Sequence, residues 1–223
     1  MSPALEFVET EAEAAATRLD DASIHLWRLP YASSQGRAPL LALIGAYLGK
    51  PASDVALVQD THGKPKLAEG DGAGTDGQQL EFNWSHSGNY ALVALARGLA
   101  LGVDIELLDK DLRSIEIARR FFDPVEADVV AALAPPARKR AFIGLWCAKE
   151  AVLKAAGEGL SFGLARLAFD RRTDTDWSLT RVDPALGHKD DWRLAGFEPA
   201  PGYRGALAWR GARRRIAAFR PVA

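Results

Sequence analysis

Hydrophobic and polar residues alternate in short runs over much of the chain, and helical spacing replaces this alternation in a few segments. The alternation predicts a strand over residues 24–29, and the apolar spacing that follows predicts a helix over 38–48 that ends at Gly49. Strands are expected again over residues 55–58, 80–85, 90–96 and 100–107. The last two are joined by Arg97-Gly98-Leu99, whose glycine is typical of a tight hairpin.

The middle of the chain has the spacing of helices. One is expected over residues 112–122, and a second begins at Asp123-Pro124-Val125-Glu126, where Asp123 can cap and Glu126 can close a capping box. A third is expected over residues 137–156, between Pro135-Pro136 and Gly157. Strands return over residues 164–169, 177–182, 192–197, 204–210 and 213–219. The expected order is therefore strands and a helix, then helices, then strands.

Residues 90–98 and 203–211 have a similar composition, each running from a tyrosine to an Arg-Gly pair. Two hairpins resemble each other this closely by chance about as often as by duplication. A boundary near residues 107–112 would nevertheless divide the chain into two comparable halves, 1–107 and 108–223.

Composition and charge exclude several classes of protein. The 223 residues are 48% hydrophobic and carry a net charge of −1, so nothing favours a nucleic-acid or anionic membrane partner. No apolar run approaches the roughly 18 residues of a membrane-spanning helix, and residues 1–20 lack a signal-peptide pattern. The single cysteine, Cys147, excludes an internal disulfide and is expected to be a buried small residue, which favours a cytoplasmic protein. Zinc-type Cys/His spacings, P-loops and dinucleotide-binding motifs are absent from the sequence.

Two carboxylates lie on one face of the strand expected over residues 100–107. Asp104 and Glu106 face one way and Val103 and Ile105 the other. Two such acids repel each other, and a hard cation such as Mg²⁺ would relieve the repulsion. Gly102 lies on the same face and would let a ligand approach the backbone. The alternative is a solvated acidic face on an edge strand.

Trp146, Glu150 and Lys154 lie one turn apart on a single face of the third helix. Glu150 could serve as a third metal ligand or as a base, and Lys154 could neutralise a phosphate oxygen. An ordinary Glu–Lys surface pair is the alternative.

Two further segments offer polar groups to an anion. Asn83-Trp84-Ser85-His86-Ser87-Gly88 is expected to be a polar turn after an apolar strand, and Gly63-Lys64-Pro65 places a lysine on a rigid turn. The alternative for residues 83–88 is a hairpin turn with capping side chains, in which His86 is an ordinary surface histidine.

In their order and spacing, these segments resemble the motifs of the Sfp-type (surfactin-synthetase-activator type) 4′-phosphopantetheinyl transferases. The resemblance covers residues 37–163. After residue 163, the chain resembles the family only in that strands are expected there. The matching motifs are Gly63-Lys64-Pro65-x-Leu67, Asn83-x-Ser85-His86-Ser87-Gly88, Gly102-Val103-Asp104-Ile105-Glu106, Phe121-Phe122 and Trp146-x-x-Lys149-Glu150-Ala151-x-x-Lys154.

The resemblance implies an α+β pseudo-dimer of two similar α/β subdomains with the active site in the cleft between them. It implies a Mg²⁺-dependent monomeric enzyme that transfers the 4′-phosphopantetheine arm of coenzyme A, its co-substrate, to a serine of an apo acyl or peptidyl carrier protein, releasing 3′,5′-ADP. The client could be a fatty-acid, polyketide or nonribosomal-peptide carrier. From residue type alone, an acidic carrier helix is expected to dock near Arg119-Arg120 and Phe121-Phe122, although both phenylalanines could instead belong to the core.

The same resemblance implies roles for individual residues. The metal ligands would be Asp104, Glu106 and Glu150. The contacts to coenzyme A would be Arg37, Lys64, Ser85, His86 and Lys154. The catalytic groups would be Glu150, as general base, with Lys154 and His86.

The chain departs from the family pattern at residues 30–36, where relatives usually have a basic helix. Arg28 and Arg37 are the basic residues on either side of this short segment that could replace it. Two other classes remain open: a different Mg²⁺-dependent phosphotransferase or nucleotidase, and a binding module that holds a carrier or nucleotide without reacting.

Overall fold

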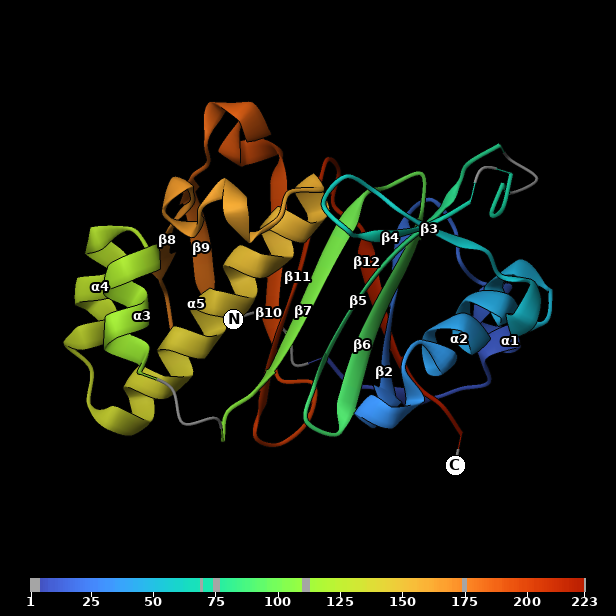
Figure 1. Cartoon of the computed structure of the whole chain (residues 1–223), viewed down its shortest axis with the longest axis horizontal. Coiled ribbons are helices and arrows are strands. Elements are labelled where there is room, and N and C mark those ends of the chain that lie inside the picture. Colours follow the sequence, from blue (N-terminus) through green and yellow to red (C-terminus); the bar gives the residue numbers. More distant parts are fainter. Residues whose placement is uncertain (1–4, 69, 74–76, 110–112, 174–175, 223) are drawn as a thin grey trace.

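Two β-sheets meet along the middle of the molecule, and helices cover the outer side of each (Figure 1). The computed structural model describes residues 5–68, 70–73, 77–109, 113–173 and 176–222. Strands and helices combine in both halves, so the expected α+β fold is confirmed. In the described part of the chain, no helix is both long and apolar enough to cross a membrane.

The first sheet has the strand order β1-β12-β2-β6-β5. Its strands are β1 (Val8–Glu9), β2 (Ser23–Pro30), β5 (Leu80–Ser87), β6 (Tyr90–Arg97) and β12 (Arg215–Arg220). β12 runs parallel to both β1 and β2, whereas β2, β6 and β5 are antiparallel neighbours. Helices α1 (Ala12–Ala16) and α2 (Ala38–Leu48) pack on this sheet, and α2 ends at Gly49 in the left-handed conformation, as the sequence predicts.

The second sheet has the antiparallel order β10-β11-β7, from β7 (Leu101–Leu107), β10 (Trp192–Phe197) and β11 (Tyr203–Arg210). The long helix α5 (Pro135–Ala156) covers one face of it. The other face, with Val103, Ile105 and Leu207, packs against Leu26 and Leu92 of the first sheet. The boundary between the sheets is therefore itself a hydrophobic core.

Two smaller ribbons and two helices complete the fold. The ribbons are β3 (Leu57–Gln59) with β4 (Pro65–Leu67) and β8 (Ala168–Arg171) with β9 (Trp177–Arg181). The helices are α3 (Ser114–Phe121) and α4 (Pro124–Ala131), beside the lower part of α5 in Figure 1. The Asp123–Glu126 capping box predicted for α4 is present.

Some expected elements are wrong in detail. Residues 97–99 do not close a hairpin, because β6 and β7 belong to different sheets; the hairpin is β5–β6, which turns at Gly88. Residues 164–166 form a 3₁₀ turn before β8, and Val55 follows another such turn, so β3 begins only at Leu57. The first residue of the helix expected over 112–122, Leu112, lies outside the described residues.

The sheets also do not divide the chain at residue 107. β7, which precedes this point, pairs with β11 in the second sheet, and β12 returns from the far end of the sequence to pair with β2 in the first. Each sheet thus takes a strand from the other half of the sequence.

A buried histidine lies between the first sheet and α2. His25 is 1% exposed, and its Nδ1 lies 2.7 Å from the hydroxyl of Tyr47, which also accepts a hydrogen bond from Trp27 Nε1. Burial, with a smaller contribution from the positive charge of Arg18, lowers the pKa of His25 to about 4. The Tyr47 hydroxyl can donate to Nδ1 only while this atom carries no proton.

We expect His25 to make the protein less stable in mild acid. The unfolded chain binds a proton on this residue near pH 6.5 and the folded chain only near pH 4, so the free energy of unfolding should fall by up to about 3 kcal/mol across this interval. Urea unfolding at a series of pH values measures the fall. The variant His25→Gln should be less stable at neutral pH but should lose less stability on acidification; an unchanged pH slope would contradict this account.

Candidate active site

Three polar side chains of β5 connect the first sheet to β7 of the second. Asn83, Ser85 and Ser87 share one face of the strand because they are two residues apart. Asn83 accepts a hydrogen bond from the backbone N–H of Val103 at 2.8 Å. The hydroxyls of Ser85 and Ser87 donate to Asp104 Oδ1 at 2.8 Å and to Glu106 Oε2 at 2.9 Å. The two predicted acidic side chains are therefore held by a row of side chains from the neighbouring sheet.

This row corrects the interpretation of residues 83–88 as a polar turn. β5 continues to Ser87, and only Gly88, with a φ of 56°, lies in the turn. A Cβ atom at Gly88 would lie 2.5 Å from the Tyr203 hydroxyl, so glycine is required both by conformation and by space.

Lys154 of α5 approaches the same carboxylate. Its Nζ lies 2.7 Å from Asp104 Oδ1 and also donates to Ser85 Oγ and to the carbonyl of Val103, both at 3.2 Å. Burial by itself lowers the pKa of Lys154, but the charge and hydrogen bond of Asp104 outweigh it and raise the pKa above its usual value. Lys154 is therefore a charged group with one acidic partner.

Glu150 lies one turn before Lys154 on α5. Burial, with smaller contributions from the negative charges of Asp104 and Glu106, raises its pKa to about 7, although Lys154 acts in the opposite direction. Its Oε1 is buried without a hydrogen-bond partner, and so is Oδ2 of Asp104. Two carboxylate oxygens thus lie next to the Asp104–Lys154 pair with unused acceptor capacity.

The donor chemistry of this site fits a hard cation, because unpartnered carboxylate oxygens are the ligands that Mg²⁺ prefers. As the side chains lie, the described residues contain no group of three Asp, Glu, His or Cys that could hold a metal ion. One oxygen of Asp104 is paired with Lys154, and one oxygen of Glu106 accepts from Ser87. Asp104 and Glu150 each retain a buried oxygen that has no hydrogen-bond partner among the described residues.

The backbone of β7 touches α5 directly at Gly102. A Cβ atom here would lie 2.1 Å from the carbonyl oxygen of Ala151 and 2.4 Å from the nitrogen of Ala155. The space that the sequence assigned to a ligand is therefore filled by the helix. This close approach brings Glu150 and Lys154 to the carboxylates of β7.

We expect Gly102→Ala to destabilise the protein by about 1–3 kcal/mol, since neither backbone atom can move without displacing α5. Chemical denaturation of the variant measures the loss. Gly159→Ala is a matched control, because a Cβ atom there meets nothing closer than 3.7 Å. Equal stability of the two variants would show that α5 can shift at little cost.

Lys64, from the segment before β4, also belongs to this site. Its Nζ donates to the carbonyl of Lys154 at 2.6 Å and to that of Leu101 at 3.3 Å. Burial lowers its pKa. Lys64 therefore binds the last turn of α5, where carbonyls lack helical partners, and places a cation at the edge of the site.

The structure does not bring every predicted residue to this cluster. His86 lies on the opposite face of β5 from Ser85, because neighbouring residues of a strand point in opposite directions. Its ring is exposed and stacks on Tyr31, with centroids 4.6 Å apart, beside Trp84. Arg37 is exposed before α2, and its side chain has no hydrogen bond or ion pair with a described residue.

One buried ion pair beside the site was not predicted. Lys149, which is fully buried, donates to Glu126 Oε2 at 2.8 Å and to the carbonyls of Leu164 and Leu167 at 2.9 and 2.7 Å. Glu126 also accepts from the N–H of Phe169 at 2.7 Å. The pair fixes α4, α5 and the segment before β8 to one another. In the sequence, the only indication of this ion pair was that Lys149 lies among apolar residues in the third predicted helix.

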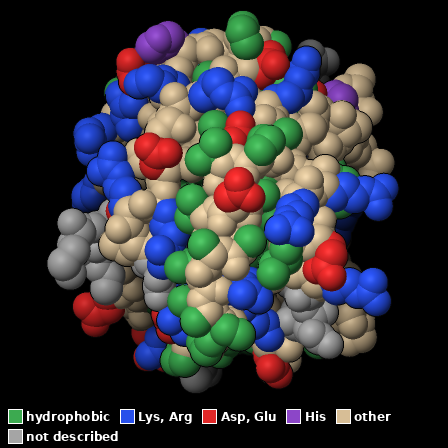
Figure 2. All heavy atoms as spheres, turned by 90° about the vertical axis from the view of Figure 1, so that its left-hand side faces the viewer, with side chains coloured by type: hydrophobic (Ala, Val, Ile, Leu, Met, Phe, Trp, Pro, Cys, Tyr) green, Lys and Arg blue, Asp and Glu red, His purple; other side chains and the backbone are tan. Residues whose placement is uncertain are grey.

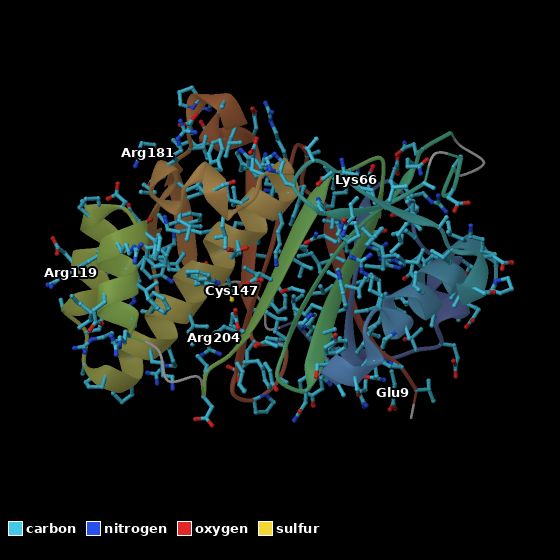
Figure 3. The ribbon with its side chains drawn as sticks, viewed as in Figure 1. Glu9, Lys66, Arg119, Cys147, Arg181 and Arg204 are labelled. Carbon is cyan, nitrogen blue, oxygen red and sulfur yellow. The ribbon has the colours of Figure 1, made fainter. Side chains whose placement is uncertain are left out.

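Cys147 lies between α5 and the second sheet (Figure 3). Its thiol is 3.6 Å from the carbonyl of Arg204, and burial raises its pKa well above the usual value. The expectation that Cys147 is a buried small residue is confirmed.

Comparison with known proteins identifies the family. Residues 100–207 match the profile of the 4′-phosphopantetheinyl transferase superfamily, and residues 31–97 match that of a 4′-phosphopantetheinyl transferase N-terminal region. The chain is 34% identical to the 4′-phosphopantetheinyl transferase HetI of Nostoc sp. over 179 residues, which are 79% of this chain and 69% of HetI. The chain belongs to the 4′-phosphopantetheinyl transferase superfamily.

Other members of the superfamily match over shorter regions. A putative 4′-phosphopantetheinyl transferase of Synechocystis sp. is 34% identical over 133 residues, which cover 60% of this chain and 50% of that protein. The 4′-phosphopantetheinyl transferase Sfp of Bacillus subtilis is 30% identical over 155 residues, which cover 70% of this chain and 63% of Sfp. The expected membership, including the likeness to the Sfp type, is confirmed.

Proposed function

We propose that this protein transfers the 4′-phosphopantetheine arm of coenzyme A to a serine of an apo acyl or peptidyl carrier protein and releases 3′,5′-ADP. Membership of the superfamily gives the reaction class. The observation that carries the proposal is the meeting of Asp104, Glu150 and Lys154, which joins unpartnered acidic oxygens to a charged amine at one point of the fold.

We further propose that the reaction requires Mg²⁺, held by Asp104, Glu106 and Glu150. The unpartnered oxygens of Asp104 and Glu150 support this assignment, and Glu106 is the third carboxylate on the same side. When bound, the ion would neutralise the charge that develops on the pyrophosphate oxygens.

The chain's own residues would position the reactants and remove a proton. Lys154 and Lys64 would attract the phosphate groups, with Ser85 as a hydroxyl donor beside them. Glu150, with its pKa raised to about 7, would accept the proton of the carrier serine as that hydroxyl attacks the β-phosphate. Arg37 and His86, both exposed, remain the proposed contacts to more distant parts of coenzyme A.

The proposed carrier-docking surface consists of Phe121, Val125 and Val129 with Arg119 and Arg120. Figure 2 shows this face of the molecule, with hydrophobic side chains between groups of lysine and arginine. Phe121, Val125 and Val129 are 44%, 69% and 36% exposed, and the Arg120 guanidinium lies over the Phe121 ring. Phe122, by contrast, is 3% exposed and stacks on Phe142 in the core.

We expect Arg119→Glu combined with Arg120→Glu to raise the KM for an acidic carrier by about tenfold, because charges at the rim of an interface control encounter. The KM for coenzyme A should not change. Steady-state kinetics with each substrate varied in turn separates the two constants. The paired variant Arg18→Glu and Arg215→Glu, at two exposed positions away from this surface, is the control, and equal effects of both pairs would contradict the assignment.

The decisive test of the reaction is the intact mass of an apo carrier protein incubated with this protein, coenzyme A and Mg²⁺. A gain of one phosphopantetheine group, abolished by EDTA, is the expected result. No gain with fatty-acid, polyketide or nonribosomal-peptide carriers, together with measurable coenzyme A binding, would favour a binding module. Turnover of nucleotides without a carrier would favour a different phosphotransferase.

We also propose that the protein acts as a monomer in the cytoplasm. All residues of the candidate site come from one chain, and its single cysteine is a buried free thiol. Sedimentation with and without a carrier protein would test the oligomeric state.

A further inference from the structure

A cavity of about 660 Å³ lies beside β10, the edge strand of the second sheet. Its walls come mainly from β9, β10 and the segment that leads into β12, with Arg213, Arg214 and Ile216, and none of the candidate active-site residues lines it. Its volume is within the range of about 300–1,000 Å³ that is typical of small-molecule sites.

The lining of the cavity combines aromatic and cationic side chains with two carboxylates, Asp176 and Asp190, the second of which is paired with Lys189. Three of the protein's six tryptophans line it, namely Trp177, Trp192 and Trp209. Four arginines also line it, namely Arg172, Arg193, Arg213 and Arg214. Aromatic walls with a few charged groups are the usual composition of a small-molecule site, and the excess of arginine and lysine over carboxylates in the lining favours an anionic ligand.

The guanidinium groups of these arginines retain unused hydrogen-bond donors. None of the four forms an ion pair with a carboxylate of the described residues. Arg172 donates to Ser178 Oγ, Arg214 to the carbonyl of Arg97, and Arg193 to the carbonyls of Asp190 and Trp192. A guanidinium has five N–H donors, so most of these donors have no acceptor among the described residues.

Two buried N–H groups of the lining also lack a partner among the described residues. Trp177 is 4% exposed, and its Nε1 makes no hydrogen bond. The Nε of Arg193 is buried and equally unpartnered. A buried donor without an acceptor is unfavourable, and a bound acceptor would relieve this cost.

We propose that this cavity binds a small polyanion that carries phosphate or carboxylate groups. Arg193 and Arg213 would pair with the acidic groups, which guanidinium ions bind with two parallel hydrogen bonds, and the tryptophans would surround the rest of the ligand. The site is separate from the one proposed for coenzyme A, so its existence does not depend on the transferase reaction.

Fluorine NMR of the protein labelled with 5-fluorotryptophan tests the proposal, with the six resonances assigned by single Trp→Phe variants. Inorganic pyrophosphate and citrate are titrated separately in EDTA, one as a phosphate and the other as a carboxylate probe. We expect at least one of them to shift the Trp177 resonance in a saturable manner. The candidate active site has its own reporters, because Trp84 and Trp146 lie in β5 and α5.

The double variant Arg193→Gln and Arg213→Gln should weaken this binding by at least about tenfold. Arg213→Gln is also measured alone, because a substitution at this exposed position is not expected to disturb folding. It should weaken binding even if the double variant does not fold. Arg119→Gln with Arg120→Gln should leave the Trp177 shift unchanged. No saturable shift of Trp177, Trp192 or Trp209 with either probe at millimolar concentration, or a shift that survives both cavity variants, would overturn the proposal.

Discussion

Replacing Asp104 by Asn is expected to lower the rate of phosphopantetheine transfer by about a thousandfold or more. The amide keeps the size of the side chain and a hydrogen bond to Ser85, but it removes the charge opposite Lys154 and the best-placed proposed metal ligand. Lys154 then loses the partner that raises its pKa. The rate is measured by the mass of the carrier under single-turnover conditions.

The control for this change is Asp109→Asn, an exposed carboxylate just after β7. Circular dichroism and thermal unfolding of both variants separate loss of chemistry from loss of fold. We expect Asp104→Asn to cost some stability as well, since Lys154 keeps its charge at a mostly buried position with one partner fewer. Near-normal transfer by the Asp104 variant would refute the metal assignment.

The variant Lys149→Met should lower the free energy of unfolding by about 3–5 kcal/mol, the usual cost of leaving half of a buried ion pair. The substitution leaves the Glu126 carboxylate, 2% exposed, with only backbone N–H partners. It also releases the carbonyls of Leu164 and Leu167. Urea denaturation measures the loss.

Combining Lys149→Met with Glu126→Gln should recover part of this stability, because the double variant no longer buries an unpaired charge. Lys139→Met is the matched control on the same helix, where the ammonium forms no ion pair with a described residue. If Lys149→Met and Lys139→Met were equally stable, the buried pair would contribute nothing specific to the fold.

Local patterns were sufficient to predict most of the elements. The period of two in residues 101–107 predicted that Asp104 and Glu106 share a face, and the structure places them so, with Val103 and Ile105 in the core behind them. The spacing of four residues placed Glu150 and Lys154 together on α5, and the capping box at Asp123 was predicted from three residues.

Contacts between distant segments could not be predicted in this way. Nothing in the sequence around Gly102 shows that α5, rather than a ligand, occupies the space beside it. The same is true of the pairing of Glu126 with Lys149. The serines of β5 are an intermediate case: the alternation Asn83-x-Ser85-x-Ser87 has the period of a strand, and that period alone is enough to place His86 on the opposite face from Ser85.

The position of β12 has a consequence for how the protein is made. In the first sheet, β2 pairs in parallel with β12, which is formed by residues 215–220. The ribosome synthesises these residues after almost all the other residues of this chain. Until then β2 has one open edge and Trp27 lacks its contact with Phe219. The amino-terminal half therefore cannot finish folding as an independent unit during synthesis, and its exposed strand edge is the surface on which a chaperone would be expected to act.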